Sequence, residues 1–291
     1  MKADRRKFMK IGASAGLIPW ANQIFAKSCS TKQPAVFVGG VVGFDSLANP
    51  KNSRNFRRMC RTGLYIHGYI WTRTPSQESK AILDTFEGLP IDVELGMVAT
   101  PESWFQKVYR PEFLDVGVRA GHAHVNGFST QPIDIWKRFV KAGQDFGLET
   151  VAPIFSPNHR QYQNASFASP TWDTLREAAK IGGAITTDSP PQFFLNQPPA
   201  YRKFVADELS WANEKGLHST FIVSPASSGD KFLDDTRRAV DFLAQNNALP
   251  KSWIVENYDP KASSFYANRI GSEDDSETVL GVALWLAKHA S

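Results

Sequence analysis

This chain of 291 residues has few cysteines and lacks the common sequence motifs of nucleophilic catalysis and of nucleotide binding. Its two cysteines, Cys29 and Cys60, are too few for a disulfide-rich scaffold, although they leave open either one disulfide or two thiols. The sequence has no Cys-x-x-Cys or Cys/His zinc pattern and no Gly-x-Ser-x-Gly elbow, so nucleophilic serine or cysteine chemistry has no support. The glycines at 39, 40 and 43 lack both dinucleotide-fingerprint spacing and a phosphate-binding lysine.

Net charge is also lacking once the first 26 residues are set aside. The formal charge of the chain is +4, and the segment 1–26 supplies five basic residues and one acidic residue. The remainder holds 28 basic and 28 acidic residues and is therefore neutral. General attraction to nucleic acid is not expected for such a body.

The N-terminal segment has a pattern of its own. Arg5 and Arg6 are followed by Phe8, Met9 and Lys10, and then by a short Gly/Ala-rich apolar run that ends near Ala26. This resembles a twin-arginine signal peptide, and the apolar run is too short and too mild for a stable membrane span. The resemblance implies residues 1–26 as signal, the twin-arginine export machinery as partner, and a periplasmic or secreted mature protein. The alternative is a basic amphipathic helix of a cytosolic protein.

From residue 35 onward, strand-like and helix-like stretches alternate. This alternation favours a parallel sheet covered by helices, and eight such units predict a single (β/α)8 barrel over 30–291, with a doubly wound open sheet as the alternative. We expect strands at 35–44, 63–71, 91–98, within 113–126, and at 148–155, 182–187, 218–223 and 252–255. We expect helices at 52–61, 76–86, 132–146, 171–180, 200–215, 231–245 and 278–289.

The segment 113–126 carries the densest polar chemistry. Its first half alternates apolar and polar residues with a period of two, which is typical of a strand with one apolar face. We expect the strand to pass into a polar loop that presents Arg119, His122 and His124. Because barrel active sites lie at the carboxyl ends of the strands, these side chains are predicted to form one wall of a site.

The inward faces of the other predicted strands are unusually polar. A structural barrel would place Val, Ile and Leu there, and buried ionisable groups are costly unless they pair or work. Loops 156–170, 190–199 and 258–276 add aromatic residues, including Phe193 and Phe194, which suggests a binding cleft or aromatic side chains that fix the loops to the barrel. The inward polar and aromatic set comprises His67, Tyr69, Trp71, Asp92, Glu94, Asp115, Arg119, Asp188 and Glu256.

Glycoside hydrolysis is the activity that these acids favour. It needs two carboxyl groups across a cleft, one protonated and one ionised. Asp188 and Glu256 each end a predicted strand, so we predict them as the catalytic pair, with Glu94 assisting and an oligo- or polysaccharide as substrate. We predict substrate-binding roles for Asp45, His67, Trp71, Arg119, His122, His124, Asn257 and Tyr258.

The body resembles glycosidase-type barrels in layout alone. The large clan of retaining barrels places acids at the ends of strands four and seven, where this chain has His122 and His124, and Ser224. No cofactor is expected for this reaction; one divalent metal is the alternative.

Two other classes of function stay open. His122-x-His124, with an acid, is suited to one divalent metal, and segments around 115–127 and 183–190 faintly resemble sugar isomerases of the xylose-isomerase type and glycerophosphodiester phosphodiesterases. A periplasmic barrel that binds a ligand without catalysis is the second alternative.

Overall fold

The computed structural model describes residues 35–40, 62–67, 91–96, 120–126, 132–145, 147–155, 170–225, 228–257 and 276–290. At residues 40, 66–67, 91–96, 120, 126 and 170–171 the description is of the backbone. Eight parallel strands pair in chain order, and β1 also pairs with β8, so the sheet closes on itself. The strands are β1 (Val36–Gly40), β2 (Thr62–His67), β3 (Ile91–Gly96), β4 (Ala120–Asn126), β5 (Thr150–Phe155), β6 (Ala184–Asp188), β7 (His218–Val223) and β8 (Ser252–Asn257).

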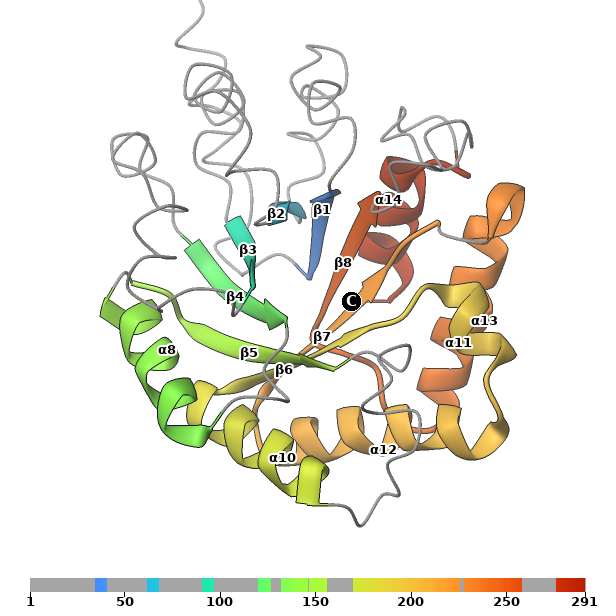
Figure 1. Cartoon of the computed structure of the whole chain (residues 1–291). Coiled ribbons are helices and arrows are strands. Elements are labelled where there is room, and N and C mark those ends of the chain that lie inside the picture. Colours follow the sequence, from blue (N-terminus) through green and yellow to red (C-terminus); the bar gives the residue numbers. More distant parts are fainter. Residues whose placement is uncertain are drawn as a thin grey trace, which may run out of the picture.

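Helices follow the later strands and lie outside the sheet (Figure 1). Sequence signals mark their ends: prolines precede α11 and α12, and the Thr278 side chain accepts a hydrogen bond from the Gly281 amide at the start of α14, at 3.2 Å. After α12, Gly216 has a φ of 75°, the left-handed conformation that glycine adopts without strain. The helices are α8 (Ile133–Asp145), α10 (Pro170–Gly182), α11 (Pro191–Asn196), α12 (Pro199–Glu214), the 3₁₀ turn η2 (Gly229–Lys231), α13 (Phe232–Gln245) and α14 (Val279–His289).

Two cores follow from the alternation of side chains along the strands. Residues on the outer face, such as Val151 and Val223, pack under the helices in the larger core, and Trp136 ties α8 to α10 through a 2.9 Å hydrogen bond to the Ala178 carbonyl. The second core comprises alternate-face residues from five strands. We call it the apolar plug, and it consists of Phe37, Tyr65, Ile154, Ile222 and Ile254.

Glycine is required at two close approaches. A Cβ on Gly39 of β1 would lie 1.8 Å from the Tyr65 carbonyl oxygen, and one on Gly182 would lie 1.9 Å from the Val151 carbonyl oxygen. Each contact is with backbone, which cannot swing aside. Gly39 therefore permits the tight pairing of β1 with β2, next to the Glu256 position of β8.

The predicted α/β class with parallel strands is confirmed. The described strands and the helices that were predicted lie within a few residues of their predicted bounds or, for β4, within the predicted stretch, and β7 matches its predicted range. The helices expected at 52–61 and 76–86 lie outside the described residues, so the complete (β/α)8 repeat stays a prediction. So does the division at residue 26, because residues 1–34 are not described.

Two predictions about local structure are wrong. The segment 190–199 is not a loop throughout, because α11 forms within it. His122 and His124 do not follow their strand in a polar loop; they lie inside β4, which continues to Asn126. The earlier half of that stretch, 113–119, lies outside the described residues. None of the helices that the structure describes is long and apolar enough to cross a membrane.

Candidate functional site

The amino end of the barrel interior holds a polar layer. His122 of β4 stacks on His218 of β7, with ring centroids 3.9 Å apart and planes at 28°. His122 Nδ1 lies 2.8 Å from the Thr150 hydroxyl, and His218 Nε2 lies 2.9 Å from the Ser252 hydroxyl. Strands β4 and β7 are not neighbours in the sheet, so the stack crosses the interior. Thr150, His218 and Ser252 are the first residues of their strands, which places this layer at the end opposite the expected active-site rim.

The middle of the interior combines the apolar plug with one further histidine. His124 is fully buried, its Nδ1 lies 2.7 Å from the Thr186 hydroxyl, and its ring meets Tyr65 edge-on at 6.1 Å. These contacts join β4 to β6 and to β2, neither of which pairs with it in the sheet. Both histidines therefore reach across the interior from one face of β4, where a loop was expected.

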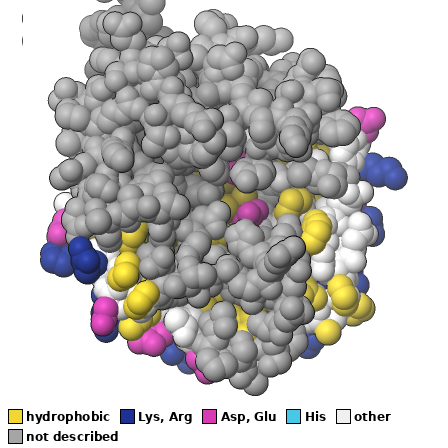
Figure 2. Space-filling model, viewed as in Figure 1, with side chains coloured by type: hydrophobic (Ala, Val, Ile, Leu, Met, Phe, Trp, Pro, Cys, Tyr) yellow, Lys and Arg dark blue, Asp and Glu magenta, His cyan; other side chains and the backbone are white. Residues whose placement is uncertain are grey.

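Acidic residues occupy the carboxyl ends of β6 and β8. Asp188 is the last residue of β6 and is half-buried, and Glu256 is the penultimate residue of β8 with 3% of its surface exposed. Each follows an interior residue by two positions, Thr186 and Ile254 respectively, so each continues the interior face. Acidic side chains are visible near the centre of the face shown in Figure 2, among residues drawn in grey.

Strand register relates the two acids. Asp188 pairs with Ile222 of β7, Ile222 pairs with Ile254 of β8, and Glu256 lies two residues further along. With strands about 4.8 Å apart and a rise of about 3.3 Å per residue, the two Cα atoms lie about 12 Å apart. Both acids have the parity of the interior face, and this register allows a carboxyl separation of about 5–10 Å, the range that hydrolytic pairs occupy.

The other predicted site residues are described in part. Glu94 of β3 is the register partner of both His67 of β2 and His124 of β4, so the backbone positions of these three form one row across the sheet. Asn257 follows Glu256 and is buried. Asp45, Trp71, Arg119 and Tyr258 lie outside the described residues, as do the cysteines.

Sequence reasoning missed three residues of the polar interior and misread one aromatic residue. His218, Ser252 and Thr186 were not among the candidates, although Ser252 and Thr186 precede Ile254 and Asp188 by two positions and His218 precedes Ile222 by four. Phe194 does not line a cleft: it is fully buried and packs against Phe221 and Phe242, with ring centroids 5.7 and 5.5 Å away. Of the two readings of the loop aromatics, the structural one therefore holds for this residue.

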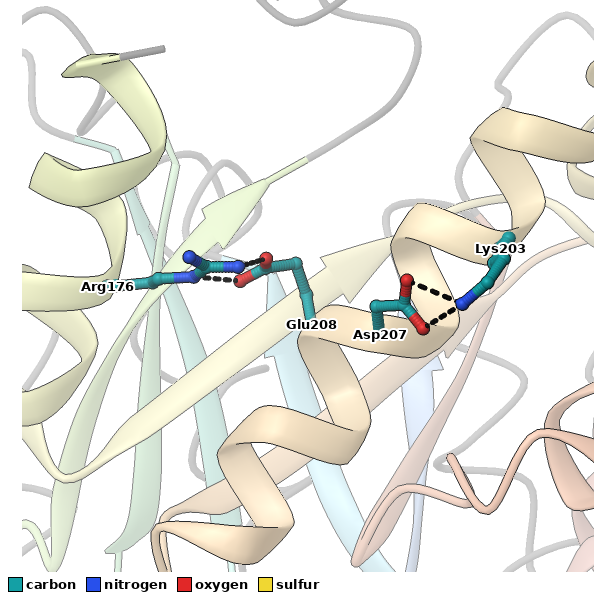
Figure 3. A network of polar contacts seen from close by, with 4 residues as sticks. All are labelled: Arg176, Lys203, Asp207 and Glu208. Atoms are coloured by element: carbon teal, nitrogen blue, oxygen red, sulfur yellow. Dashed lines mark hydrogen bonds and ion pairs between the residues drawn. The ribbon is translucent and has the colours of Figure 1, made fainter. Parts of the chain in front are cut away.

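The buried ion pair of the described region lies away from this interior. Arg176 of α10 binds both carboxylate oxygens of Glu208 of α12, and the Glu208 side chain is fully buried (Figure 3). Burial raises the pKa of Glu208, while its hydrogen bonds and charge attraction with Arg176 act against that rise. This pair joins two helices that lie outside the sheet (Figure 1).

A metal site is not assembled by the described side chains. Among them, no group of three or more His, Cys, Asp or Glu residues is arranged to hold a metal ion. Nδ1 of His122 and Nδ1 of His124 are each engaged with a threonine hydroxyl. The expected absence of a cofactor and the alternative of one divalent metal both stay predictions, since only the backbone of Glu94 is described.

Comparison with known proteins gives no family. No family model matches the chain, and no curated protein matches it. Among solved structures, phosphoribosyl anthranilate isomerase from Thermococcus kodakaraensis is 12% identical with a TM-score of 0.47, over 89% of this chain and 100% of that one. A homocysteine methyltransferase from Escherichia coli is 13% identical with a TM-score of 0.46, over 89% and 97%. Likeness at this level assigns neither family nor activity to the chain.

Proposed function

We propose that this chain is a (β/α)8-barrel hydrolase that cleaves a glycan with Asp188 and Glu256 as its carboxylate pair. One observation carries the proposal: both acids continue the interior face at the carboxyl ends of β6 and β8, the end at which barrel enzymes carry their chemistry. The apolar plug lies beneath them, so a substrate at this end would be closed off from the opposite end of the barrel.

The unequal surroundings of the two acids suit a division of roles. A carboxyl group in the more buried setting favours the protonated form, and a more solvated one stays ionised. Glu256 is therefore the proposed proton donor to the glycosidic oxygen. Asp188, which is half-buried, is the proposed base or nucleophile on the other side of the sugar ring.

The remaining predicted residues take supporting roles in this proposal. Glu94 shares a row with His67 and His124, and we assign Glu94 an assisting role and the two imidazole positions to substrate binding. Asn257 follows the acid on β8, and Asp45, Trp71, Arg119 and Tyr258 complete the binding surface. His122 belongs instead to the layer at the amino end, where we assign it to stability.

Screening the purified mature protein tests the activity. Panels of glycans and of phosphodiesters are incubated with and without a chelator, and products are followed by chromatography. We expect the wild type to hydrolyse a glycan at a rate that the chelator does not change. Asp188→Asn and Glu256→Gln should each lower that rate at least a thousandfold. Glu214→Gln, on the exposed end of α12, is the matched control and should keep wild-type activity. Activity on phosphodiesters that chelation abolishes would replace this proposal with the metal-dependent alternative, and glycan binding without turnover would favour a binding protein.

Export through the twin-arginine route is a separate proposal, based on Arg5, Arg6 and the apolar run that follows them. Substitution of both arginines by lysine should retain the full-length protein in the cytoplasm of a bacterial host, whereas Lys27→Arg, just beyond the proposed cleavage site, should not. Equal export of the double variant and the wild type would refute the signal.

A further inference from the structure

Strand β7 lies between the two strands that carry the proposed acids. Asp188 ends β6, Glu256 lies near the end of β8, and β7 pairs with both of these strands. We propose that Ser224, the residue that follows β7, is a specificity-determining residue: its small side chain lies between the two acids and leaves room there for the sugar ring. The role in substrate selection rests on the proposed function, whereas the placement of Ser224 does not.

The alternation of side chains along β7 directs Ser224 toward the barrel interior. Ile222 belongs to the apolar plug, and Val223 packs in the larger core outside the sheet. Side chains two residues apart in an extended chain share a face, so Ser224 takes the face of Ile222. Pro225 follows, and because the residue before a proline favours the extended region, the alternation continues past the end of the strand. Ser224 is 3% exposed, which agrees with an inward side chain.

Strand register places Ser224 beside Glu256. The last registered pair of β7 and β8 immediately precedes these two residues, so they lie opposite each other with their Cα atoms about 4.8 Å apart. On the other side of β7, Asp188 pairs with Ile222, two residues before Ser224. The inward residues of β7 at the level of the acids are therefore Ile222, which closes the interior below them, and Ser224, which lies nearer the carboxyl end.

The residues on both sides of Glu256 are smaller than a packed barrel requires. Packed barrels fill their inward positions with bulky branched residues such as Val, Ile and Leu. Beside Glu256, β7 contributes the hydroxymethyl group of Ser224, and β1 contributes Gly39, the register partner of Glu256, which has no side chain. A glycoside hydrolase holds the sugar ring between its two carboxyl groups. A branched side chain at position 224 would occupy that space.

A double-mutant cycle in urea unfolding tests the placement without any substrate. Ser224→Asp adds a carboxylate beside Glu256, and like charges this close repel each other. We expect Ser224→Asp to lower the urea midpoint at pH 8, and Glu256→Gln to restore at least half of that fall. Ser210→Asp, on α12 outside the sheet, is the matched control, and Glu256→Gln should not change its effect. Additive effects of Ser224→Asp and Glu256→Gln would overturn the placement. If Ser224→Asp alone does not fold, recovery of folded protein by Glu256→Gln supports the placement and no recovery overturns it.

A series of side-chain sizes, assayed on the glycan found by screening, tests the role in specificity. Ser224→Ala should keep at least half of the wild-type kcat/KM, whereas Ser224→Leu should lower it about a hundredfold by displacing the sugar ring. Ser224→Val takes the place of Ser224→Leu if the latter does not fold, and Ser210→Leu is the control for added bulk. Wild-type kcat/KM in the larger variants, or an equal loss in Ser224→Ala, would overturn this role. Coupling between Ser224→Asp and Glu256→Gln, together with no glycan hydrolysis by the wild type, would refute the proposed function and leave the placement of Ser224 standing.

Discussion

The ion pair between α10 and α12 yields the sharpest prediction about stability. Arg176 is 32% exposed in its side chain, whereas the Glu208 carboxylate that it binds is fully buried. Arg176 also lies over the Trp211 ring, 5.5 Å from its centre. Arg176→Met keeps much of the apolar stem over Trp211 and removes the charge, so the substitution isolates the cost of leaving Glu208 without its partner.

The expected cost has a ceiling. Without Arg176, the buried carboxylate can escape its desolvation by taking up a proton, and from an ordinary pKa of 4.5 this costs about 3 kcal/mol at pH 7. The ceiling falls by about 1.4 kcal/mol per pH unit and is close to zero near pH 4.5. Because the pKa of Glu208 is raised in the folded state, its contribution to stability is fully present below the unfolded pKa. That contribution is lost as pH rises through the folded pKa, and the loss is larger in the variant.

Urea unfolding followed by circular dichroism from pH 5 to pH 8 measures this cost. Arg176→Met should lose up to about 3 kcal/mol at pH 7 and about 1.4 kcal/mol at pH 5.5, and Arg176→Met with Glu208→Gln should recover most of the loss. Glu208→Gln alone should cost less than Arg176→Met, because the partly exposed guanidinium can reach water. A loss in Arg176→Met that is the same at every pH would refute the reasoning.

Three further substitutions test the packing of the barrel. Phe194→Ala should lower the free energy of unfolding by about 3–5 kcal/mol in the same assay, because Phe194 fills the space between Phe221 and Phe242. The control, Phe193→Ala, should lower it clearly less, because Phe193 in the same helix is half-buried. Equal losses in the two variants would contradict this packing. Gly39→Ala should abolish soluble folded protein, since its Cβ would lie 1.8 Å from a carbonyl oxygen. The control, Gly147→Ala, has open space around the Cβ but a φ of 87°, so it should lower the free energy of unfolding by only about 1 kcal/mol. A well-folded Gly39→Ala would disprove the close approach. His218→Ala should lower stability by about 1–3 kcal/mol through loss of the imidazole stack and the bond to Ser252, with turnover unchanged; a selective loss of turnover would mean that the layer at the amino end takes part in the reaction.

The fold could be predicted for the strands and helices that have one apolar face and one polar face. The alternation along 62–67 and 252–257 separates outer from inner residues, and the helical spacing in 231–245 marks a buried stripe. Two short-range signals failed. Paired prolines in 190–199 resemble a loop, yet burial of Phe194 stabilises a helix of six residues there. In 113–126, the clear period of two in the first half led to a strand being predicted there. The observed strand, β4, lies in the second half, where the apolar side chains are small.

The site could be predicted only as far as strand parity extends. Parity places Asp188 and Glu256 inside, because side chains two residues apart share a face. It did not place His122 and His124 there, since they were expected in a loop after the strand and have the opposite parity to Arg119. It gives no depth along the barrel axis, so the sequence could not separate His122, near the amino end, from His124 in the middle. Nor could it reveal that His218 stacks on His122, since that contact depends on the register across four strands.

Cleavage of activated glycosides tests the proposed roles of Glu256 and Asp188 most directly. A dinitrophenyl glycoside has a leaving group that departs without a proton, whereas a natural glycosidic link needs one. We predict that Glu256→Gln loses activity on the natural glycan but retains at least a tenth of wild-type kcat on the activated substrate, while Asp188→Asn loses both. Comparable activity of the two variants and the wild type on both substrates would contradict the assignment of this carboxylate pair.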